Sequence, residues 1–320
     1  MLLLRGADIA AACTMGEAID AVADGFRLLS SARAQVPQRT VISIPDSGHL
    51  LVMPAATAAA PHWVIKGVVV APQNIRSGLP LVTASVLLGD ARTGELLALL
   101  DGGALTALRT GAAGGVAART LARPDASRVA LFGAGEQAWA QLLAAAAVRA
   151  LREVRIVARD AAHARAFLER AQAHPAFASV ALSCPGPERA IDGADLVVTA
   201  TSSHTPVFDG TRLPQGLHVT AVGSFRPDMR ELDRATLRGA LVAVDQRAGA
   251  LHEAGELQGL GAGDVVELGE ILAGTVPGRS SPDQRTVFKS VGNGIQDLVV
   301  ASLAYTNALE RGIGEDIQWP

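Results

Sequence analysis

The pattern of apolar and polar positions changes near residue 120, and the two sides predict different structures. A helix is predicted at 14–33, where Thr14 and Glu17 have the spacing of a capping box. The turn at 90–94 lies between two strand-like segments, which indicates a hairpin and an antiparallel or mixed sheet. The predicted elements that follow the first helix are strands at 41–44, 50–53, 63–70, 82–88 and 95–100 and a small-residue helix at 104–122.

After residue 128, short apolar segments alternate with helical ones. This alternation predicts parallel βαβ units with right-handed crossovers. A last helix is predicted at 295–309 and is expected to pack on the first half of the chain. The other elements predicted here are strands at 129–132, 154–158, 180–183, 196–199, 218–222 and 241–244 and helices at 137–148 and 161–173.

Composition and charge favour a two-domain α/β protein and argue against nucleic-acid binding. The chain has 320 residues, enough for two domains, and 49% are apolar with few aromatics, which suits helices packed on a sheet. The net charge is −3 and no segment is a basic run, so nucleic-acid binding is not expected. Cys13 and Cys184 form neither a disulfide framework nor a metal-binding spacing. We find no signal peptide and no membrane span, and expect a cytoplasmic protein.

Residues 131–138 carry a candidate dinucleotide-binding motif, Gly133-x-Gly135-x-x-Ala138. Gly133 would make the tight turn, Gly135 would let the backbone approach a pyrophosphate, and Ala138 would let helix and strand pack closely. The alternative is a plain turn in an Ala/Gly-rich chain. The predicted strand before the motif and the helix after it favour nucleotide binding.

The residues after the next strand bear on the choice of cofactor. An acid at the end of this strand would bond the 2′-hydroxyl of NAD, but Ala158 occupies that position and Arg159 follows it. This favours NADP(H), with NAD(H) as the alternative. In the other interpretation, Asp160 caps the next helix and Arg159 faces solvent.

Lys66 and Lys289 are the two lysines among 28 basic residues. Lys66 lies within the apolar strand 63–70, where it needs water, an anion or a lowered pKa; alternatively, the strand is half exposed and Lys66 points outward. Arg109 lies inside a small-residue helix and needs a partner. Asp297 either orients Lys66 or is an ordinary polar-face residue.

Short segments along the whole chain resemble one known family in its order. They are Met53-Pro54-Ala55; Lys66 with Pro72-x-Asn74 and Gly78-Leu79-Pro80; Thr93-Gly94; Asp101-Gly102; Leu105-Thr106-x-x-Arg109-Thr110; Gly133-x-Gly135-x-Gln137-Ala138; Gly193-Ala194-Asp195; Glu231-Leu232-Asp233; Gly255-Glu256; and Thr286-Val287-Phe288-Lys289-Ser290 with Gly292. On these segments the chain resembles the ornithine cyclodeaminase/mu-crystallin family.

The resemblance implies an α/β homodimer subunit: a Rossmann-type doubly wound parallel sheet that binds NAD(P) at 120–292, and an α+β substrate-binding and dimerisation domain at 1–119 with 293–320. It implies small amino acids or cyclic imino acids as substrates and no metal. The implied catalytic residues are Arg39, Lys66 and Arg109, which would hold the substrate carboxylate. The implied cofactor-binding residues are Thr83, Thr110, Gly133, Gly135, Glu136, Gln137, Ala138, Arg159 and Thr201; the implied pocket residues are Met53, Phe225, Arg226, Val291 and Gly292.

One departure from the family pattern bears on the reaction. Ornithine-cyclising members resemble Val-Gly-Gly-Asp-x-Pro, but Phe225 stands in place of that aspartate, and Leu51 in place of an upstream acid. The string from Arg226 to Asp233 resembles the ketimine-reductase branch instead. We therefore expect an NAD(P)H-dependent reductase of small cyclic imino acids, or a related amino-acid dehydrogenase. The alternatives are ornithine cyclodeaminase and a crystallin-like cofactor-binding protein without turnover.

Several remaining polar residues are ambiguous. Lys66 would either stabilise the substrate carboxylate or supply a proton to the C=N nitrogen. His218 is expected to be structural. Glu253 and Glu256 could reach the pocket, although a solvated face is the favoured interpretation.

Overall fold

The computed structural model describes residues 1–45 and 47–318. The chain divides into two compact units, Met1–Arg109 with Gly292–Pro320 (unit 1) and Thr110–Val291 (unit 2). The first division lies inside helix α3 (Gly102–Leu121), ten residues before the boundary expected at 119/120. Because one continuous helix spans the division, no change in the sequence pattern marks it.

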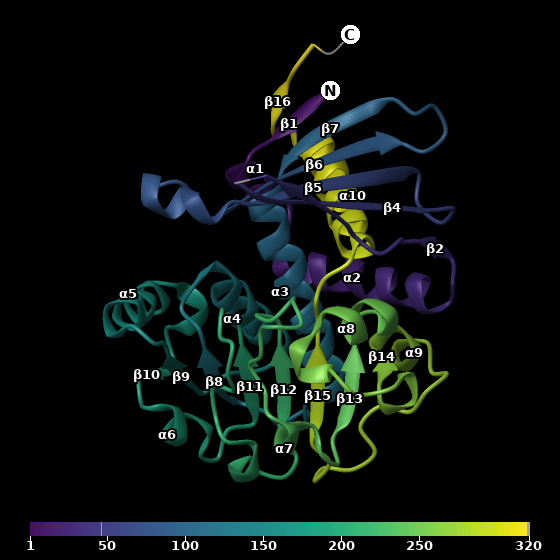
Figure 1. Ribbon diagram of the computed structural model, residues 1–320. Helices are drawn as coiled ribbons and strands as arrows, with labels where there is room; N and C mark the ends of the chain where they lie inside the picture. The colour runs from purple at the N-terminus through teal and green to yellow at the C-terminus, as the bar shows by residue number, and fades with distance from the viewer. Residues whose placement is uncertain (46, 319–320) are drawn as a thin grey trace. The chain divides into compact units, whose positions relative to one another are not determined.

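Unit 1 is built on a mixed eight-stranded sheet of order β16-β1-β7-β6-β5-β4-β2, with β3 paired to β4 (Figure 1). β1 runs parallel to β7 and the other pairs are antiparallel, so the hairpin expected after residue 82 is confirmed. The strands are β1 Leu2–Leu4, β2 Ala34–Gln35, β3 Thr40–Ile44, β4 Gly48–Thr57, β5 His62–Val70, β6 Val82–Asp90, β7 Leu96–Asp101 and β16 Glu315–Asp316.

Helix α10 (Gly294–Arg311) covers one face of this sheet and packs on β4, β5 and β6. Helix α2 (Met15–Ser30) packs on α10, and a Cβ at Gly25 would lie 3.2 Å from Val299 Cγ1, so the small residue lets the helices approach. The predicted capping box of α2 is confirmed, since Glu17 N donates to Thr14 Oγ1 at 3.2 Å. Helix α1 (Gly6–Ala12) was not predicted and also contacts α10.

Unit 2 is a wholly parallel eight-stranded sheet of order β10-β9-β8-β11-β12-β15-β13-β14 (Figure 1). The expected Rossmann-type sheet is confirmed. Its strand order reverses between β8 and β11, where ligands of doubly wound sheets bind. The strands are β8 Arg128–Phe132, β9 Glu153–Val157, β10 Ala181–Ser183, β11 Leu196–Thr199, β12 His218–Ala221, β13 Leu241–Val244, β14 Val266–Glu267 and β15 Thr286–Lys289.

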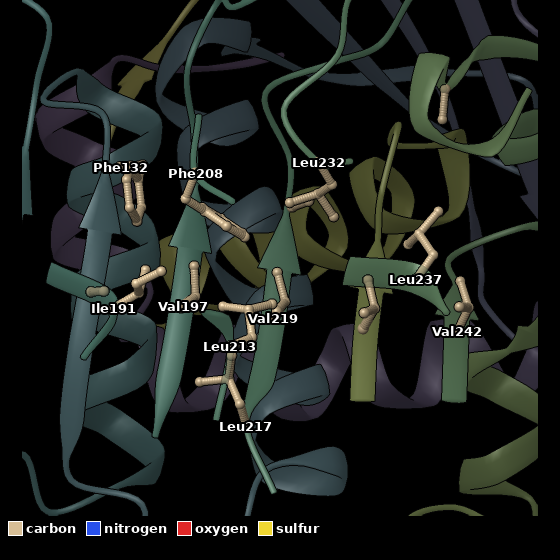
Figure 2. Close-up of a cluster of buried hydrophobic side chains, with 14 of the residues drawn as sticks. Phe132, Ile191, Val197, Phe208, Leu213, Leu217, Val219, Leu232, Leu237 and Val242 are labelled. Atoms are coloured by element: carbon tan, nitrogen blue, oxygen red, sulfur yellow. The ribbon is translucent and has the colours of Figure 1, made fainter. Parts of the chain in front are cut away.

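Two apolar layers cover the two faces of this sheet. Within β8, Val129 and Leu131 face one layer while Ala130 and Phe132 face the other, as the two-residue period of a strand requires. Figure 2 shows the layer that contains Phe132. In addition to the second part of α3, the α-helices of unit 2 are α4 Glu136–Val148, α5 Ala161–Gln172, α6 Pro187–Ile191, α7 Arg234–Leu237, α8 Arg247–Glu253 and α9 Leu268–Leu272.

A search of the described residues finds no helix that is long and apolar enough to cross a membrane.

Candidate active site

Lys66 and Arg109 share one buried carboxylate in unit 1. Lys66 Nζ lies 2.8 Å from Asp297 Oδ1 and 2.7 Å from Oδ2, and Arg109 Nε donates to Oδ1 at 3.1 Å. Lys66 is 1% exposed and Asp297 0%. The outward-pointing interpretation of Lys66 is therefore wrong, and of the two roles considered for Asp297 the structure supports the one that orients Lys66. When Lys66 is in its ammonium form, two cations on one carboxylate leave this trio with a net positive charge.

The surroundings of Lys66 disfavour its protonated form. Burial and the guanidinium of Arg109, helped by Arg39, lower the pKa of Lys66 to about 7, although Asp297 opposes the shift. In register, Lys66 lies between Met53 on β4 and Val86 on β6, both buried, so the strands supply the apolar surroundings. A lysine with this pKa exchanges its proton near neutral pH.

Arg39 is the third cation of this site, and Gly292 holds it through a backbone hydrogen bond. We call Arg39, Lys66 and Arg109 the cationic cluster. Arg39 Nη2 donates to Gly292 O at 2.8 Å, and Arg109 Nη1 donates to Gln296 Oε1 at 2.8 Å. Gly292 has φ +78°, and a Cβ there would lie 2.5 Å from Arg109 Nη1. The left-handed backbone favours glycine here, and a side chain would displace the guanidinium of Arg109.

Thr83, expected to touch the cofactor, is not brought to the cationic cluster. The register pairs Val69 with Thr83 and Lys66 with Val86, so Thr83 lies on the opposite face of the sheet, where it is exposed. Met53, expected in the pocket, is buried beside Lys66.

The strand–turn–helix around residues 128–148 has the geometry that a dinucleotide pyrophosphate needs. Gly133 has φ +117°, and a Cβ there would lie 2.5 Å from Ala200 O. A Cβ at Gly135 would meet nothing within 4 Å, and Gly135 precedes α4 without a side-chain cap. Ala138 is fully buried, 3.7 Å from the Gly133 Cβ position. The open backbone at the start of α4 fits a phosphate group.

The loop after β9 holds the two residues that bear on the cofactor preference. Asp160 caps α5 by accepting from the backbone N–H groups of Ala162 and His163 at 2.7 and 3.1 Å, so that part of the alternative interpretation is confirmed. Arg159 is exposed beside it.

Other predicted residues of unit 2 have structural partners. Thr201 donates through its backbone N and Oγ1 to Glu231 Oε1, and the backbone carbonyl of Thr110 accepts from Gln141. Phe225 is 37% exposed. Two further predicted residues form ion pairs at the surface: Glu136 pairs with Arg170, and Arg226 pairs with Asp228. The backbone N–H of Val291 donates to the buried carboxylate of Asp245. Gln137 Oε1 is buried without a hydrogen-bond partner in the described structure.

A buried polar network in unit 2 was not predicted. Lys289 Nζ donates to Ser224 Oγ at 2.7 Å, and Ser224 donates to Glu256 at 2.6 Å. Glu231 accepts from the backbone of Thr201 and Gly223. The solvated-face interpretation of Glu253 and Glu256 is wrong, since they are 9% and 1% exposed. The scarcity of lysine drew attention to Lys289, but nothing in the sequence indicated which acid it meets.

A separate surface cavity of about 570 Å³ lies at the amino ends of β8, β9 and β10. Arg123 and Arg128 there pair with Asp195, at 2.8 and 3.5 Å, and Asp195 also accepts from two backbone N–H groups at the start of β8. These contacts tie strand starts together. In doubly wound sheets the ligand lies at the other ends of the strands.

Comparison with known proteins agrees with this arrangement. The sequence profile described as "Ornithine cyclodeaminase/mu-crystallin family" matches residues 1–312. The chain belongs to the ornithine cyclodeaminase/mu-crystallin family. Within the family it is 38% identical to a Δ1-pyrroline-2-carboxylate reductase of Bacillus cereus, over the full length of both chains.

Two solved structures share the whole fold of this family member. The Δ1-pyrroline-2-carboxylate reductase of Thermococcus litoralis, in complex with NADH and L-proline, has a TM-score of 0.92 and 36% identity, with 99% of this chain and 100% of that chain covered. An archaeal alanine dehydrogenase dimer with bound NAD has a TM-score of 0.91 and 34% identity, with 100% and 99% covered.

Proposed function

We propose that this protein is an NAD(P)H-dependent reductase of small cyclic imino acids of the Δ1-pyrroline-2-carboxylate type. The observation that carries the proposal is the buried trio of Lys66, Arg109 and Asp297, whose excess positive charge suits a substrate carboxylate. A guanidinium binds a carboxylate through parallel N–H groups. The relatives named as Δ1-pyrroline-2-carboxylate reductases support the substrate class.

The chain's own residues supply the binding of the carboxylate and the control of protons. When bound, the nicotinamide supplies a hydride to the imine carbon. Arg39 and Arg109 orient the carboxylate, and Asp297 holds the Nζ of Lys66 within the same cluster. In its ammonium form, Lys66 either binds the carboxylate or delivers the proton that the C=N nitrogen requires. Gly133, Gly135 and the start of α4 would hold the pyrophosphate.

The direct test is oxidation of NADPH or NADH by the purified protein with Δ1-pyrroline-2-carboxylate or Δ1-piperideine-2-carboxylate. Lys66→Met should lower kcat/KM by roughly 10²–10⁴-fold, while the variant remains folded and its affinity for NADH stays near wild type. Ornithine with NAD is the companion assay. Ammonia and proline from ornithine, without imine reduction, would identify a cyclodeaminase and contradict the inference from Phe225 and Leu51.

An amino-acid dehydrogenase is the second candidate, because the archaeal alanine dehydrogenase shares the whole fold. The chemistry is the same if the imine forms from a 2-oxo acid and ammonia. Cofactor oxidation with pyruvate and ammonium, faster than with the cyclic imines, would favour this activity. Cofactor binding with no turnover of any of these substrates would favour the crystallin-like binding protein.

We further propose that NADPH is preferred through Arg159. The Asp160 carboxylate is engaged as a helix cap, and the exposed guanidinium of Arg159 suits a 2′-phosphate. Arg159→Ala should raise the KM for NADPH and leave that for NADH unchanged. The relatives' structures contain NAD or NADH; a wild-type preference for NADH would overturn this part of the proposal.

We also propose that the chain forms a homodimer through the face of the unit 1 sheet opposite α10. By register, Ile42, Leu50 and Val69 form one apolar row on that face, and Ile65 and Leu87 form another. Ile42 is 47% exposed and Ile65 37%. Uncovered apolar faces mark association surfaces. Ile42→Lys with Ile65→Lys should give a monomer by light scattering; a wild-type monomer would contradict the proposal.

A further inference from the structure

Asn293 is a buried amide that the fold does not use. It directly precedes α10, is 5% exposed, and neither Oδ1 nor Nδ2 has a hydrogen-bond partner in the described part of the chain. An asparagine at this position normally caps the helix, but this side chain makes no cap bond. A buried polar group without a partner destabilises the fold, so its presence calls for an explanation.

The neighbours of Asn293 in sequence hold the cationic cluster. The carbonyl of Gly292 accepts from Arg39, and Gln296, in the first turn of α10, accepts from Arg109. Asp297 follows and meets both Lys66 and Arg109. Asn293 therefore belongs to the same turn as the groups that position the three cations.

The acceptors in this turn are already engaged by the cations. Gly292 O, Gln296 Oε1 and Asp297 Oδ1 each accept a hydrogen bond from a lysine or arginine, and Asp297 Oδ2 lies 2.7 Å from the Nζ of Lys66 in an ion pair. Donors for a bound carboxylate are abundant, but a protonated cyclic imine also presents an N–H beside its carboxylate. That N–H needs an acceptor, and Asn293 Oδ1 has the capacity for it.

We propose that Asn293 is a ligand-binding residue whose Oδ1 accepts from the ring N–H next to the carboxylate held by the cationic cluster. This inference rests on the proposed function of that cluster as the carboxylate site. It makes Asn293 a determinant of specificity: the site prefers a ring with N–H over an isosteric ring with oxygen, because a ring N–H donates well to Oδ1, whereas a furan oxygen is a poor acceptor even for a turned Nδ2.

Two planar probes that cannot be reduced test this preference. Pyrrole-2-carboxylate carries the ring N–H, and furan-2-carboxylate replaces it with oxygen. Titration calorimetry on the full chain with saturating NADH should show wild type binding pyrrole-2-carboxylate about tenfold more tightly. In Asn293→Ala, the ratio of the two dissociation constants should fall to within about twofold of unity.

Asn307 provides the matched control. It is an asparagine within α10, and its Nδ2 donates to Ala12 O at 2.9 Å. Asn307→Ala should lower the thermal midpoint and keep the wild-type ratio. If Asn293→Ala does not fold, Asn293→Leu replaces it: the volume remains but the acceptor is lost, so the ratio of the two dissociation constants should again fall to within about twofold of unity.

Two results would overturn the inference while leaving the carboxylate site intact. Both probes binding wild type with equal affinity would show that the site has no acceptor for a ring N–H. An unchanged ratio in Asn293→Ala would show that another group supplies the acceptor. Failure of both probes to bind wild type would instead overturn the carboxylate site itself, and with it this inference.

Discussion

At the scale of single residues, Lys66 determines the expected pH dependence. Both of its proposed roles require the ammonium form, and its pKa is lowered to about 7. The proton is therefore bound below pH 7 and lost above it, so kcat/KM should fall about tenfold per pH unit on the alkaline side. A pH–rate profile with Δ1-pyrroline-2-carboxylate measures this limb.

A variant of Asp297 can show whether the alkaline limb arises from Lys66 or from protonation of the substrate. The carboxylate raises the pKa of Lys66 against burial and the arginines. Asp297→Asn should therefore lower that pKa and move the alkaline limb toward acid. The protonation of the free imine does not depend on the variant, so an unmoved limb would assign it to the substrate.

His218 gives a second pH prediction, on stability. It is fully buried between Thr286 and Thr220, and burial, with Arg279 and Arg149, lowers its pKa from 6.5 to about 3. Between these values the unfolded state binds a proton that the folded state does not. The free energy of unfolding should thus decrease by about 1.4 kcal/mol per unit as pH falls through this window.

Chemical denaturation at several pH values measures that slope. In His218→Gln, which keeps a polar side chain between the two threonines, the contribution of about 1.4 kcal/mol per pH unit should disappear. An unchanged slope would assign the acid sensitivity to other groups.

Lys66 and Arg109 were predictable because charged side chains interrupt apolar or small-residue segments. Their polar partners were harder to predict: Asp297 was one of two alternatives for its role, and Gln296 was not considered because its spacing is ordinary for the polar positions of a helix. Glu256 was assigned to a solvated face, because its burial depends on Ser224 and Lys289, which are distant in sequence. Local patterns show that a buried charge needs a partner but do not identify that partner.

At the scale of elements, the two glycines of the turn between β8 and α4 have different roles. Gly133 is needed for the fold of the turn, and Gly135 leaves room for the pyrophosphate. Gly133→Ala would place a Cβ against Ala200 O with φ +117°, so it should lower the thermal midpoint and abolish NADH binding together. Gly135→Ala meets no protein atom, and its φ is −98°. It should leave the midpoint near wild type and weaken NADH binding about tenfold.

Fluorescence titration of NADH, with thermal unfolding of the same samples, distinguishes the two variants. If Gly133→Ala weakened NADH binding but left the thermal midpoint unchanged, the structural role assigned to the backbone of Gly133 would be contradicted. Unchanged affinity in Gly135→Ala would remove the pyrophosphate from this turn.

Most elements were predicted from their hydrophobic period, including the four-residue strands β11, β12 and β13, whereas the short strands β1, β2, β14, β15 and β16 were not. Helices α2, α4 and α10 and strands β5, β6 and β8 carry clear periods and lie within a few residues of the expected ranges. Strand β15 was missed although it lies inside the parallel sheet, between β12 and β13. Its four residues include Lys289, whose charge is neutralised by contacts from other segments. Such a strand has no local signature.

At the scale of the whole molecule, unit 1 is made of two separate chain segments, and a truncation tests whether it needs the second one. A chain ending at Val291 lacks α10, so the face of β4, β5 and β6 loses its apolar cover and Lys66 loses Asp297. Hydrogen exchange should show loss of protection throughout β4–β6, because an uncovered buried charge and an uncovered apolar face both destabilise the unit. Residues 128–148 should remain protected and bind NADH.

Loss of protection in both units would show that they fold as one cooperative block. The sequence predicted that the last helix packs on the first half of the chain, because an apolar face must be covered. Pairing of β1 with β7 and β16 was not predictable, since strands of two or three residues are specified by their partners.

The position of α10 also imposes an order on biosynthesis. Every residue of unit 2 is translated before Gly294, so unit 2 can fold on the ribosome while the strands of unit 1 still wait for the helix that covers them. During that interval Lys66 and Arg109 must stay in contact with water, because Asp297 does not yet exist. The cationic cluster is thus among the last features of the nascent protein to form, and a chaperone that shields β4–β6 would act in that interval.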